Sequence, residues 1–271
     1  MPEPSTPDDR TLDALLAARD GRRISVCLPA RNEEATVGRI VRAIRRELVE
    51  RHPLVDEVLV IDDRSSDATA AVARAAGARV VIGPGEGKGS AMWRGVFEAD
   101  GDVVVFCDAD VRNFSPTFVT GLLVPLLTDD GVAFVKASYD RPYEGRAGEG
   151  GRVTELAAKP LLRVLFPALA GIAQPLAGEC AGRRDVLEAV PFVEGYGVDI
   201  ALLIDITARV GAGAVAQVDL GERVHRNRPL AELGLQAEEV LRAVLSRAGL
   251  GSAVAERPPL LDTPGYARQS A

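Results

Sequence analysis

Short apolar runs alternate with longer amphipathic segments through the first half of the chain. The apolar runs are rich in Val and Ile, as buried strands are, and lie at 24–28, 55–61, 79–82, 103–106 and 132–137. The segments between them repeat apolar residues at helical spacing and lie at 35–50, 67–76, 90–98 and 116–127. Strands that alternate with helices predict an α/β domain with a mostly parallel sheet flanked by helices.

The second half of the chain is less regular. A strand is expected at 215–220, a glycine-rich loop at 139–151, and helical stretches at 153–169, 198–210 and 230–247. The first of these helices contains Pro160 and Pro167 and is apolar enough to suggest a membrane surface. Because Lys159 and Arg163 interrupt its apolar face, a buried helix or a dimer contact is favoured instead.

One large domain is expected to contain most of the 271 residues. We expect a loose tail and a short helix at 1–20, the domain at 21–250 and a C-terminal tail at 251–271. The tail is rich in proline from about Glu256, which predicts that it is disordered or packs on a partner.

Composition and charge exclude several classes of protein. Asp and Glu total 39 against 32 Lys and Arg, a net charge of −7, and aromatic residues make up 4%, so nucleic-acid binding through bulk charge is not expected. No apolar run approaches the ~18 residues of a membrane span, and the acidic, proline-rich start is unlike a signal peptide. Cys27, Cys107 and Cys180 lie in apolar stretches, which indicates reduced thiols and a cytoplasmic protein.

Polar clusters follow three of the predicted strands. They are 29–33 (Pro-Ala-Arg-Asn-Glu), Asp62 with Asp63, and 108–110 (Asp-Ala-Asp). Ligands of open α/β sheets bind beyond the carboxyl ends of the strands, so we expect these clusters to converge at one edge. Carboxylates that lie so close together repel one another unless a cation lies among them. A divalent metal that bridges phosphate oxygens would meet that need.

The loop at 83–90 has the chemistry of a phosphate cradle. It is rich in glycine, carries Lys88 and precedes a predicted helix, so it offers backbone N–H groups, a helix N-terminus and a cation. It is not a P-loop, because Gly89 stands where that motif requires Ser or Thr. The glycine pattern at 211–216 follows a predicted helix and leads into a strand, the reverse of a dinucleotide-binding motif, and is set aside.

Two later segments complete the candidate chemistry. Arg152 and Thr154 follow a double glycine at the start of a predicted helix, where N–H groups, a guanidinium and a hydroxyl suit an anion. His225 lies among cations and polar groups rather than on an apolar face. As a metal ligand it would complement Asp110.

These motifs resemble those of nucleotide-sugar glycosyltransferases with the GT-A fold. The strand-end clusters carry that resemblance, and many such enzymes share them. Longer blocks are more specific and resemble one retaining family, the glucosyl-3-phosphoglycerate synthases of actinobacteria; they lie at 87–89, 150–156, 174–179, 195–200 and 225–230. The resemblance spans residues 24–247, most of the chain.

The resemblance implies a hexosyltransferase that moves glucose from a nucleotide sugar, UDP-glucose first among the candidates, to 3-phospho-D-glycerate with retention. It implies a half at 21–138 that binds the nucleotide sugar and a half at 139–250 that binds the acceptor. A homodimer is also expected. The developing charge on the leaving diphosphate would be stabilised by the metal and Lys88, and same-face attack by the glycerate hydroxyl is favoured because no carboxylate stands out as a nucleophile.

Site residues follow from the same resemblance. Donor binding is implied for Pro29, Ala30, Arg31, Glu33, Asp63, Lys88, Asp108, Ala109, Asp110 and Asp199. Among them, Lys88, Asp110 and Asp199 are expected to take part in catalysis. Acceptor binding is implied for Gly151, Arg152, Thr154 and Asn227. Asp110 and His225 are the implied ligands of a divalent metal, Mg²⁺ or Mn²⁺.

Departures from the family pattern leave the donor open. The family has Leu, Ser, Ser and Glu where this chain has Arg31, Asp63, Ala109 and Asp199. Asp199 is expected beside the donor sugar, so glucose or mannose, and UDP or GDP, remain alternatives. A mannosyl-3-phosphoglycerate synthase that uses GDP-mannose is therefore the first alternative function.

Other classes fit the residues less well. An inverting transferase that acts on a polyprenyl phosphate would share the strand-end clusters but would not need Arg152 or His225. A sugar-1-phosphate nucleotidylyltransferase would need a glycine-rich arginine motif after the first strand, and 29–32 is not one. A nucleotide-sugar binding module without catalysis is disfavoured by the intact metal and acceptor candidates.

Overall fold

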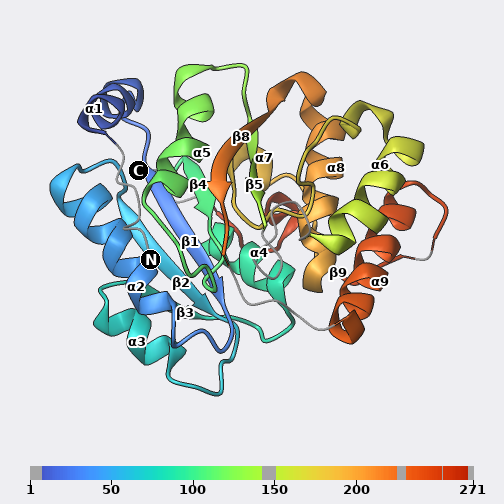
Figure 1. Ribbon diagram of the computed structural model, residues 1–271, viewed down its shortest axis with the longest axis horizontal. Coiled ribbons are helices and arrows are strands. Elements are labelled where there is room, and N and C mark those ends of the chain that lie inside the picture. Colours follow the sequence, from blue (N-terminus) through green and yellow to red (C-terminus); the bar gives the residue numbers. More distant parts are fainter. Residues whose placement is uncertain (1–7, 142–150, 225–229, 252, 268–271) are drawn as a thin grey trace.

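A seven-stranded sheet runs through the protein and carries helices on both faces (Figure 1). The computed structural model describes residues 8–141, 151–224, 230–251 and 253–267. The strands of the sheet are β1 (Ile24–Ala30), β2 (Glu57–Asp62), β3 (Arg79–Ile82), β4 (Val103–Phe106), β5 (Phe134–Asp140), β6 (Cys180–Arg183) and β8 (Val215–Glu222). Their order is β3-β2-β1-β4-β6-β5-β8, and every neighbouring pair is parallel except the two pairs that β6 makes with β4 and β5. The predicted mostly parallel sheet is confirmed.

The helices connect the strands as the apolar spacing predicts. They are α1 (Asp9–Ala18), α2 (Val37–Ile44), α3 (Thr69–Ala75), α4 (Lys88–Glu98), α5 (Thr117–Thr128), α6 (Lys159–Leu165), α7 (Arg184–Leu187), α8 (Val198–Val210) and α9 (Leu230–Arg247). α2 continues as a π-helical segment, Arg45–Arg51, so the helix expected at 35–50 is one continuous helix over 37–51 whose hydrogen bonding changes after Ile44. In Figure 1, α6, α8 and α9 lie together beyond β5 and β8.

The core has one layer on each face of the sheet. Along β1, Val26 and Leu28 contribute to one apolar cluster, and Cys27 contributes to the cluster on the opposite face. β2 alternates in the same way, with Val60 on the first face and Leu59 on the second. Because both faces are covered, these strands appear in the sequence as continuous apolar runs rather than as alternating ones.

β6 is the element that the apolar pattern misses. Its four residues, Cys-Ala-Gly-Arg, include neither a β-branched nor an aromatic side chain. The strand is nevertheless central, since it pairs with β4 through Val103–Arg183 and with β5 through Phe134–Gly182. Tertiary pairing on both edges therefore stabilises a segment whose local preference for a strand is weak.

The segment at 153–169 is only partly buried. It contains a π-helical turn, Thr154–Ala158, then α6 and a 3₁₀ turn, Pro167–Leu169. Pro160 is the second residue of α6, directly after the π-helical turn, and the helical backbone continues through it to Leu165. Leu156 and Val164 are 81% and 78% exposed, so the buried helix expected here keeps an open apolar face. No helix in the described ranges is both long and apolar enough to cross a membrane.

The C-terminal residues pack on their own domain. β9 (Glu256–Arg257) pairs with β7 (Phe192–Val193) in a second, two-stranded sheet. Trp93 on α4 donates its indole N–H to the Pro258 carbonyl at 2.8 Å, and Leu260 is fully buried. The expectation of a disordered or partner-bound end is therefore wrong for residues 253–267.

Replacing Leu260 with alanine tests this packing. The Leu260→Ala variant is expected to lose about 2–5 kcal/mol of the free energy of unfolding in urea, because it opens a cavity in a closed site. Leu261→Ala is the matched control, since that side chain is 58% exposed and its loss should change stability by about 0.5 kcal/mol or less. Equal effects from the two variants would show that the segment is not held on the domain.

Candidate active site

The polar clusters after β1, β2 and β4 converge on one cavity. β1 and β2, and β1 and β4, are parallel neighbours, so their carboxyl ends meet at the same edge of the sheet. The cavity has a volume of about 220 Å³, and its walls include Pro29, Ala30, Arg31, Glu33, Asp63, Lys88, Asp108, Ala109 and Asp110. These are all of the residues implied as donor-binding except Asp199, and the structure brings them together with Gly87, Ala91 and Tyr196.

Lys88 lies between two carboxylates at the start of α4. Its Nζ is 2.9 Å from Asp199 Oδ2 and 3.0 Å from Asp108 Oδ1. Burial by itself would lower the pKa of Lys88, but the two carboxylates hold that pKa well above its usual value. The lysine is therefore a fixed, fully charged cation whose side chain is 15% exposed to the cavity. Such a group suits the negative charge of a diphosphate.

Asp63 shapes the glycine-rich loop that leads to Lys88. Its carboxylate accepts hydrogen bonds from the backbone N–H of Gly85 at 2.7 Å and of Gly87 at 3.0 Å. Gly87, the residue before α4, has a φ of 99°, which side chains rarely adopt. Gly89 lies so close to the Val193 carbonyl that a β-carbon would overlap it. The loop thus needs glycine at these positions, and Asp63 uses both of its oxygens to hold it.

Asp199 joins Lys88 to a second, deeper lysine. It lies in the first turn of α8, and its Oδ2 accepts the hydrogen bond from Lys88. Its Oδ1 is buried and has no hydrogen-bond partner among the described residues. Lys136, 1% exposed on β5, has its Nζ 4.0 Å from that oxygen and donates to the Ala177 carbonyl at 2.5 Å. Asp199 Oδ1 is thus a buried acceptor without a partner among the described residues, and a hydroxyl group of a ligand could donate a hydrogen bond to it.

Arg223 forms ion pairs with both aspartates that follow β4. Its guanidinium lies 2.7 Å from Asp108, 2.9 Å from Asp110 and 3.0 Å from the fully buried Glu179. Burial would lower the pKa of Arg223, yet Glu179, Tyr139 and the aspartates hold it well above its usual value. Burial would also raise the pKa of Asp108, but Lys88 and Arg223 hold it well below its usual value. Two buried cations thus lie among aspartates whose like charges would otherwise repel one another.

The same network extends toward the segment predicted to bind the acceptor. The Tyr139 hydroxyl donates to Glu179 at 2.7 Å, and Arg141 donates to that hydroxyl at 2.8 Å. Burial raises the pKa of Tyr139, and Glu179 raises it further. A β-carbon on Gly151 would lie 3.8 Å from Thr154 and 3.9 Å from Arg141, so these three residues are neighbours.

The first turn after residue 150 has an open hydrogen-bonding position. Gly151 has a φ of 71°, which favours glycine. The Thr154 hydroxyl is buried and has no hydrogen-bond partner among the residues that the structure describes. Arg152, at the same turn, is partly buried. The turn therefore has the donors and the geometry for an anion.

His225 and Asn227 lie outside the described residues, but the residue before them is held near Asp110. Val224 accepts a hydrogen bond from the Arg112 backbone at 2.8 Å, and its own N–H donates to the Asn113 side chain at 2.8 Å. Within the described ranges, no group of three or more His, Cys, Asp or Glu side chains is placed to hold a metal. Because His225 lies outside the described residues, Asp110 is the one predicted metal ligand whose position is known.

Comparison with known proteins identifies the family. The model of the family described as Glycosyl transferase family 2 matches residues 25–190. The glucosyl-3-phosphoglycerate synthase of Mycolicibacterium paratuberculosis is 50% identical over 257 residues, which cover 89% of this chain and 77% of the relative. That of Petrotoga mobilis is 44% identical over 237 residues, covering 83% and 73%. The chain belongs to the glucosyl-3-phosphoglycerate synthases of glycosyl transferase family 2.

A solved structure of the same family is similar over nearly the whole chain. The crystal structure of glucosyl-3-phosphoglycerate synthase from Mycobacterium tuberculosis in complex with Mn²⁺, UDP-glucose and phosphoglyceric acid has a TM-score of 0.85. It is 43% identical, and the match covers 96% of this chain and 99% of that one. The family resemblance and the GT-A architecture predicted from the sequence are confirmed.

Four buried members of the site are absent from the site residues expected from the sequence, although one of them, Glu179, ends the motif at 174–179. They are Lys136, Tyr139, Glu179 and Arg223, which connect Asp199, Asp108 and Asp110 to the rest of the cluster. One signal was available: Glu179 is a single carboxylate in the otherwise uncharged stretch 164–182 and therefore needs a buried cation. That this cation is Arg223, the residue directly after β8, could not be known without the fold.

The contact between Gly178 and Asp108 gives a direct test of this arrangement. A β-carbon on Gly178 would overlap the Asp108 carboxylate, so Gly178→Ala must push that side chain away from Lys88 and Arg223. We expect a loss of about 1–3 kcal/mol in the free energy of unfolding, as for an overpacked interior. Gly171→Ala is the matched control, because nothing lies within 4 Å of a β-carbon there. If the two variants unfold at the same urea concentration, Asp108 is not held as described.

Proposed function

We propose that the chain transfers glucose from UDP-glucose to 3-phospho-D-glycerate and releases UDP and glucosyl-3-phosphoglycerate. The observation that carries this proposal is the match over 96% of the chain to a crystal structure that holds Mn²⁺, UDP-glucose and phosphoglyceric acid. A second structure of that enzyme holds Mn²⁺, UDP and glucosyl-3-phosphoglycerate, the other side of the same reaction. Curated relatives at 44–50% identity bear the name of this activity.

The donor is proposed to bind in the 220 Å³ cavity. Pro29, Ala30, Arg31 and Glu33 would face the nucleoside, and Lys88 would face the diphosphate, since it is the lysine in the cavity wall. Asp63 would act by holding the loop before Lys88. Asp199 would face the sugar, because its unsatisfied Oδ1 is free to accept a hydrogen bond from a hydroxyl.

A divalent metal is proposed as the cofactor, since structures of the Mycobacterium tuberculosis enzyme hold Mn²⁺ or Mg²⁺ with UDP. Asp110 and His225 would hold it, a carboxylate oxygen and an imidazole nitrogen that both metals accept alongside phosphate oxygens. The anchoring of Val224 to the turn after Asp110 supports their approach. When bound, the metal neutralises charge on the diphosphate as UDP leaves.

The chain's own residues then govern the transfer. Lys88 donates to the diphosphate and stabilises the charge that develops on it as the glycosidic bond breaks. The carboxylates nearest the sugar are held by cations, Asp199 by Lys88 and Asp108 by Lys88 and Arg223, and the Asp199 oxygen that has no partner among the described residues is assigned to a sugar hydroxyl, so neither carboxylate is assigned as a nucleophile. We therefore propose retention by attack of the glycerate hydroxyl on the face from which UDP departs: the bond from the sugar C1 to the diphosphate oxygen breaks, the glycerate oxygen bonds to C1, and the hydroxyl proton passes to the departing diphosphate oxygen. The ring passes through a cationic state that the nearby carboxylates favour.

The acceptor is proposed to bind at the turn after residue 150. Gly151, Arg152 and Thr154 would hold its phosphate together with Asn227, because the turn offers a backbone N–H group, a guanidinium and a buried hydroxyl with no partner among the described residues. Holding both substrates in one cleft supplies part of the rate through proximity.

A homodimer and a cytoplasmic location are also proposed. The exposed Leu156 and Val164 supply an apolar face of the kind that a second copy would cover. Three buried, unpaired cysteines suit a reducing compartment. A monomer by analytical ultracentrifugation, or recovery in a membrane fraction, would contradict these two proposals.

An assay of nucleotide sugars tests the function. With Mg²⁺ or Mn²⁺ and 3-phosphoglycerate, UDP-glucose is expected to be the preferred donor over GDP-mannose, and excess EDTA is expected to abolish the transfer. The readout is the sugar phosphoglycerate formed, resolved by mass. Preference for GDP-mannose would support the mannosyl alternative, and full activity in EDTA would remove the metal from the reaction.

Arg152→Ala tests the acceptor site. Losing a charged hydrogen-bond partner of the phosphate should raise the KM for 3-phosphoglycerate by roughly ten- to a hundredfold, about 1.5–3 kcal/mol, and leave the KM for UDP-glucose unchanged. The control is Arg163→Ala, an exposed arginine on α6. Glycerate without its phosphate should be a poor acceptor for both the wild type and Arg152→Ala. Equal use of glycerate and 3-phosphoglycerate by the wild type would refute the phosphate assignment.

A further inference from the structure

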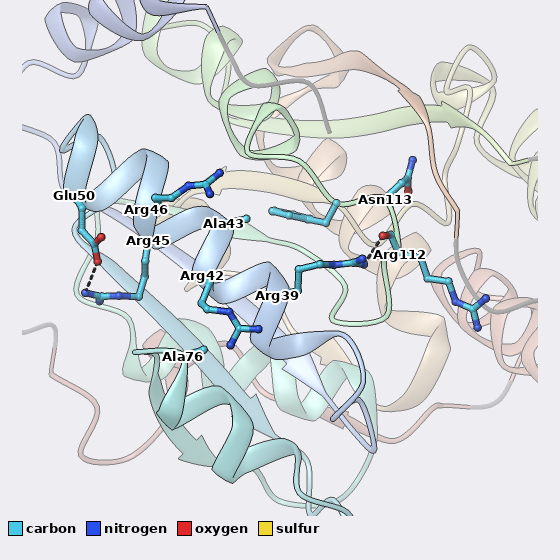
Figure 2. A pocket seen from close by; sticks show the side chains of 10 residues that line it. Arg39, Arg42, Ala43, Arg45, Arg46, Glu50, Ala76, Arg112 and Asn113 are labelled. Carbon is cyan, nitrogen blue, oxygen red and sulfur yellow. Dashed lines mark hydrogen bonds and ion pairs between the residues drawn. The ribbon is translucent and has the colours of Figure 1, made fainter. Parts of the chain in front are cut away.

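A second cavity lies beside α2 and the π-helical segment that continues it (Figure 2). Its volume is about 570 Å³, and none of its lining residues lines the donor cavity. Five arginines form its walls: Arg39, Arg42, Arg45, Arg46 and Arg112. We call this cavity the arginine pocket.

The charge in the arginine pocket is almost entirely positive. Glu50 is the one carboxylate among its described lining residues, and it accepts from Arg45 at 3.1 Å. Arg39 is bound to the backbone carbonyls of Val111 and Arg112, which do not neutralise it. The side chains of Arg42, Arg46 and Arg112 make no hydrogen bond or ion pair within the described part of the chain, and all three are exposed.

This concentration of arginine is unusual in a protein with a net charge of −7. Several arginines outside the pocket are bound to carboxylates, as Arg19 is to Asp56 and Arg247 is to Asp205, whereas no such pair neutralises Arg39, Arg42, Arg46 or Arg112 within the described residues. Arg42 and Arg46 are one helical turn apart, so their like charges lie on the same side of the helix and destabilise it. An anion bound among these guanidinium groups would offset their mutual repulsion and so stabilise this part of the protein.

The geometry limits what that anion can be. Guanidinium groups bind phosphate through paired N–H bonds, and several of them around one cavity favour a ligand with more than one phosphate group. Ala43, Ala76 and the buried Phe114 form an apolar floor against which a carbon skeleton can rest. The cavity is concave and of the size of small-molecule sites, which favours a soluble molecule over a membrane or a nucleic acid.

We propose that the arginine pocket is a second anion site, for a small soluble molecule that carries two or more phosphate groups. This site does not depend on the proposed transfer reaction. It is connected to the donor cavity through the turn that follows Asp110. Arg39 binds the carbonyls of Val111 and Arg112, and Thr36 on the approach to α2 donates to the Ala109 carbonyl at 2.6 Å.

Calorimetric titration with tripolyphosphate tests the proposal. The double variant Arg42→Gln/Arg46→Gln is expected to bind tripolyphosphate at least about tenfold more weakly than the wild type at this site. Arg163→Gln/Arg209→Gln removes the same charge from exposed positions outside the pocket and is expected to bind like the wild type. Any tripolyphosphate bound in the donor cavity is common to all three proteins, so the difference between them reports the arginine pocket.

The fold and the basal activity serve as controls. Both double variants replace exposed side chains. Their urea unfolding midpoints should therefore match that of the wild type, and their rates of glucosyl transfer should stay within about twofold of the wild-type rate. Three results would overturn the proposal: equal loss of binding in both double variants, equal affinity of the wild type for inorganic phosphate and tripolyphosphate, or no tripolyphosphate site that depends on Arg42 and Arg46. Binding to phosphatidylglycerol vesicles or to an oligonucleotide that needs these arginines, without tripolyphosphate binding, would also overturn it.

Discussion

The donor cavity depends on buried cations that hold together carboxylates which would otherwise repel one another. Lys88 lies between Asp108 and Asp199, and Arg223 lies between Asp108, Asp110 and Glu179. In a low-dielectric interior, each carboxylate is tolerated only because a cation lies at hydrogen-bond distance. The charges of the cavity wall are therefore fixed in place before any substrate binds. Charge that develops during a reaction can then be stabilised without reorganising these side chains.

The sheet topology brings those charges together. β1, β2 and β4 place three polar clusters at one edge. The residues just before β6, which runs antiparallel between β4 and β5, place Gly178 against the Asp108 carboxylate and Glu179 beside Arg223. Arg223 itself directly follows β8, the last strand of the sheet. The chain has three lysines, and two of them, Lys88 and Lys136, are used in this cluster. An acidic protein therefore presents a fixed cation, Lys88, in the wall of a cavity that also carries several carboxylates.

Much of the fold and the donor site could be predicted because both depend on local patterns. The strands at 79–82 and 103–106 and the helices at 198–210 and 230–247 have the bounds that apolar spacing gives them. Nine of the ten residues predicted to bind the donor line one cavity because they lie at or after the carboxyl ends of parallel strands, a rule that the sequence alone can apply. What could not be predicted depends on long-range pairing. β6 has no strand-like composition of its own, and the partner of Glu179 lies 44 positions away on Arg223.

The C-terminal end illustrates the same limit. Its prolines and exposed polar residues have the composition of a free tail, yet Leu260 fills a closed site on the domain. The arginine pocket is also hidden in the sequence, because its arginines read as the solvated face of an amphipathic helix until Arg112 is brought beside them. Tertiary contact, rather than local preference, decides both cases.

The most direct measurement is the dissociation constant of UDP in the presence of Mn²⁺ for the wild type and for Lys88→Met. If Lys88 is the fixed cation that receives the diphosphate, the variant should bind UDP at least about tenfold more weakly, and Lys159→Met, a lysine on α6 outside the cavity, should bind it like the wild type. Unchanged UDP affinity in a folded Lys88→Met protein would contradict the role given to Lys88 and to the carboxylates that hold it.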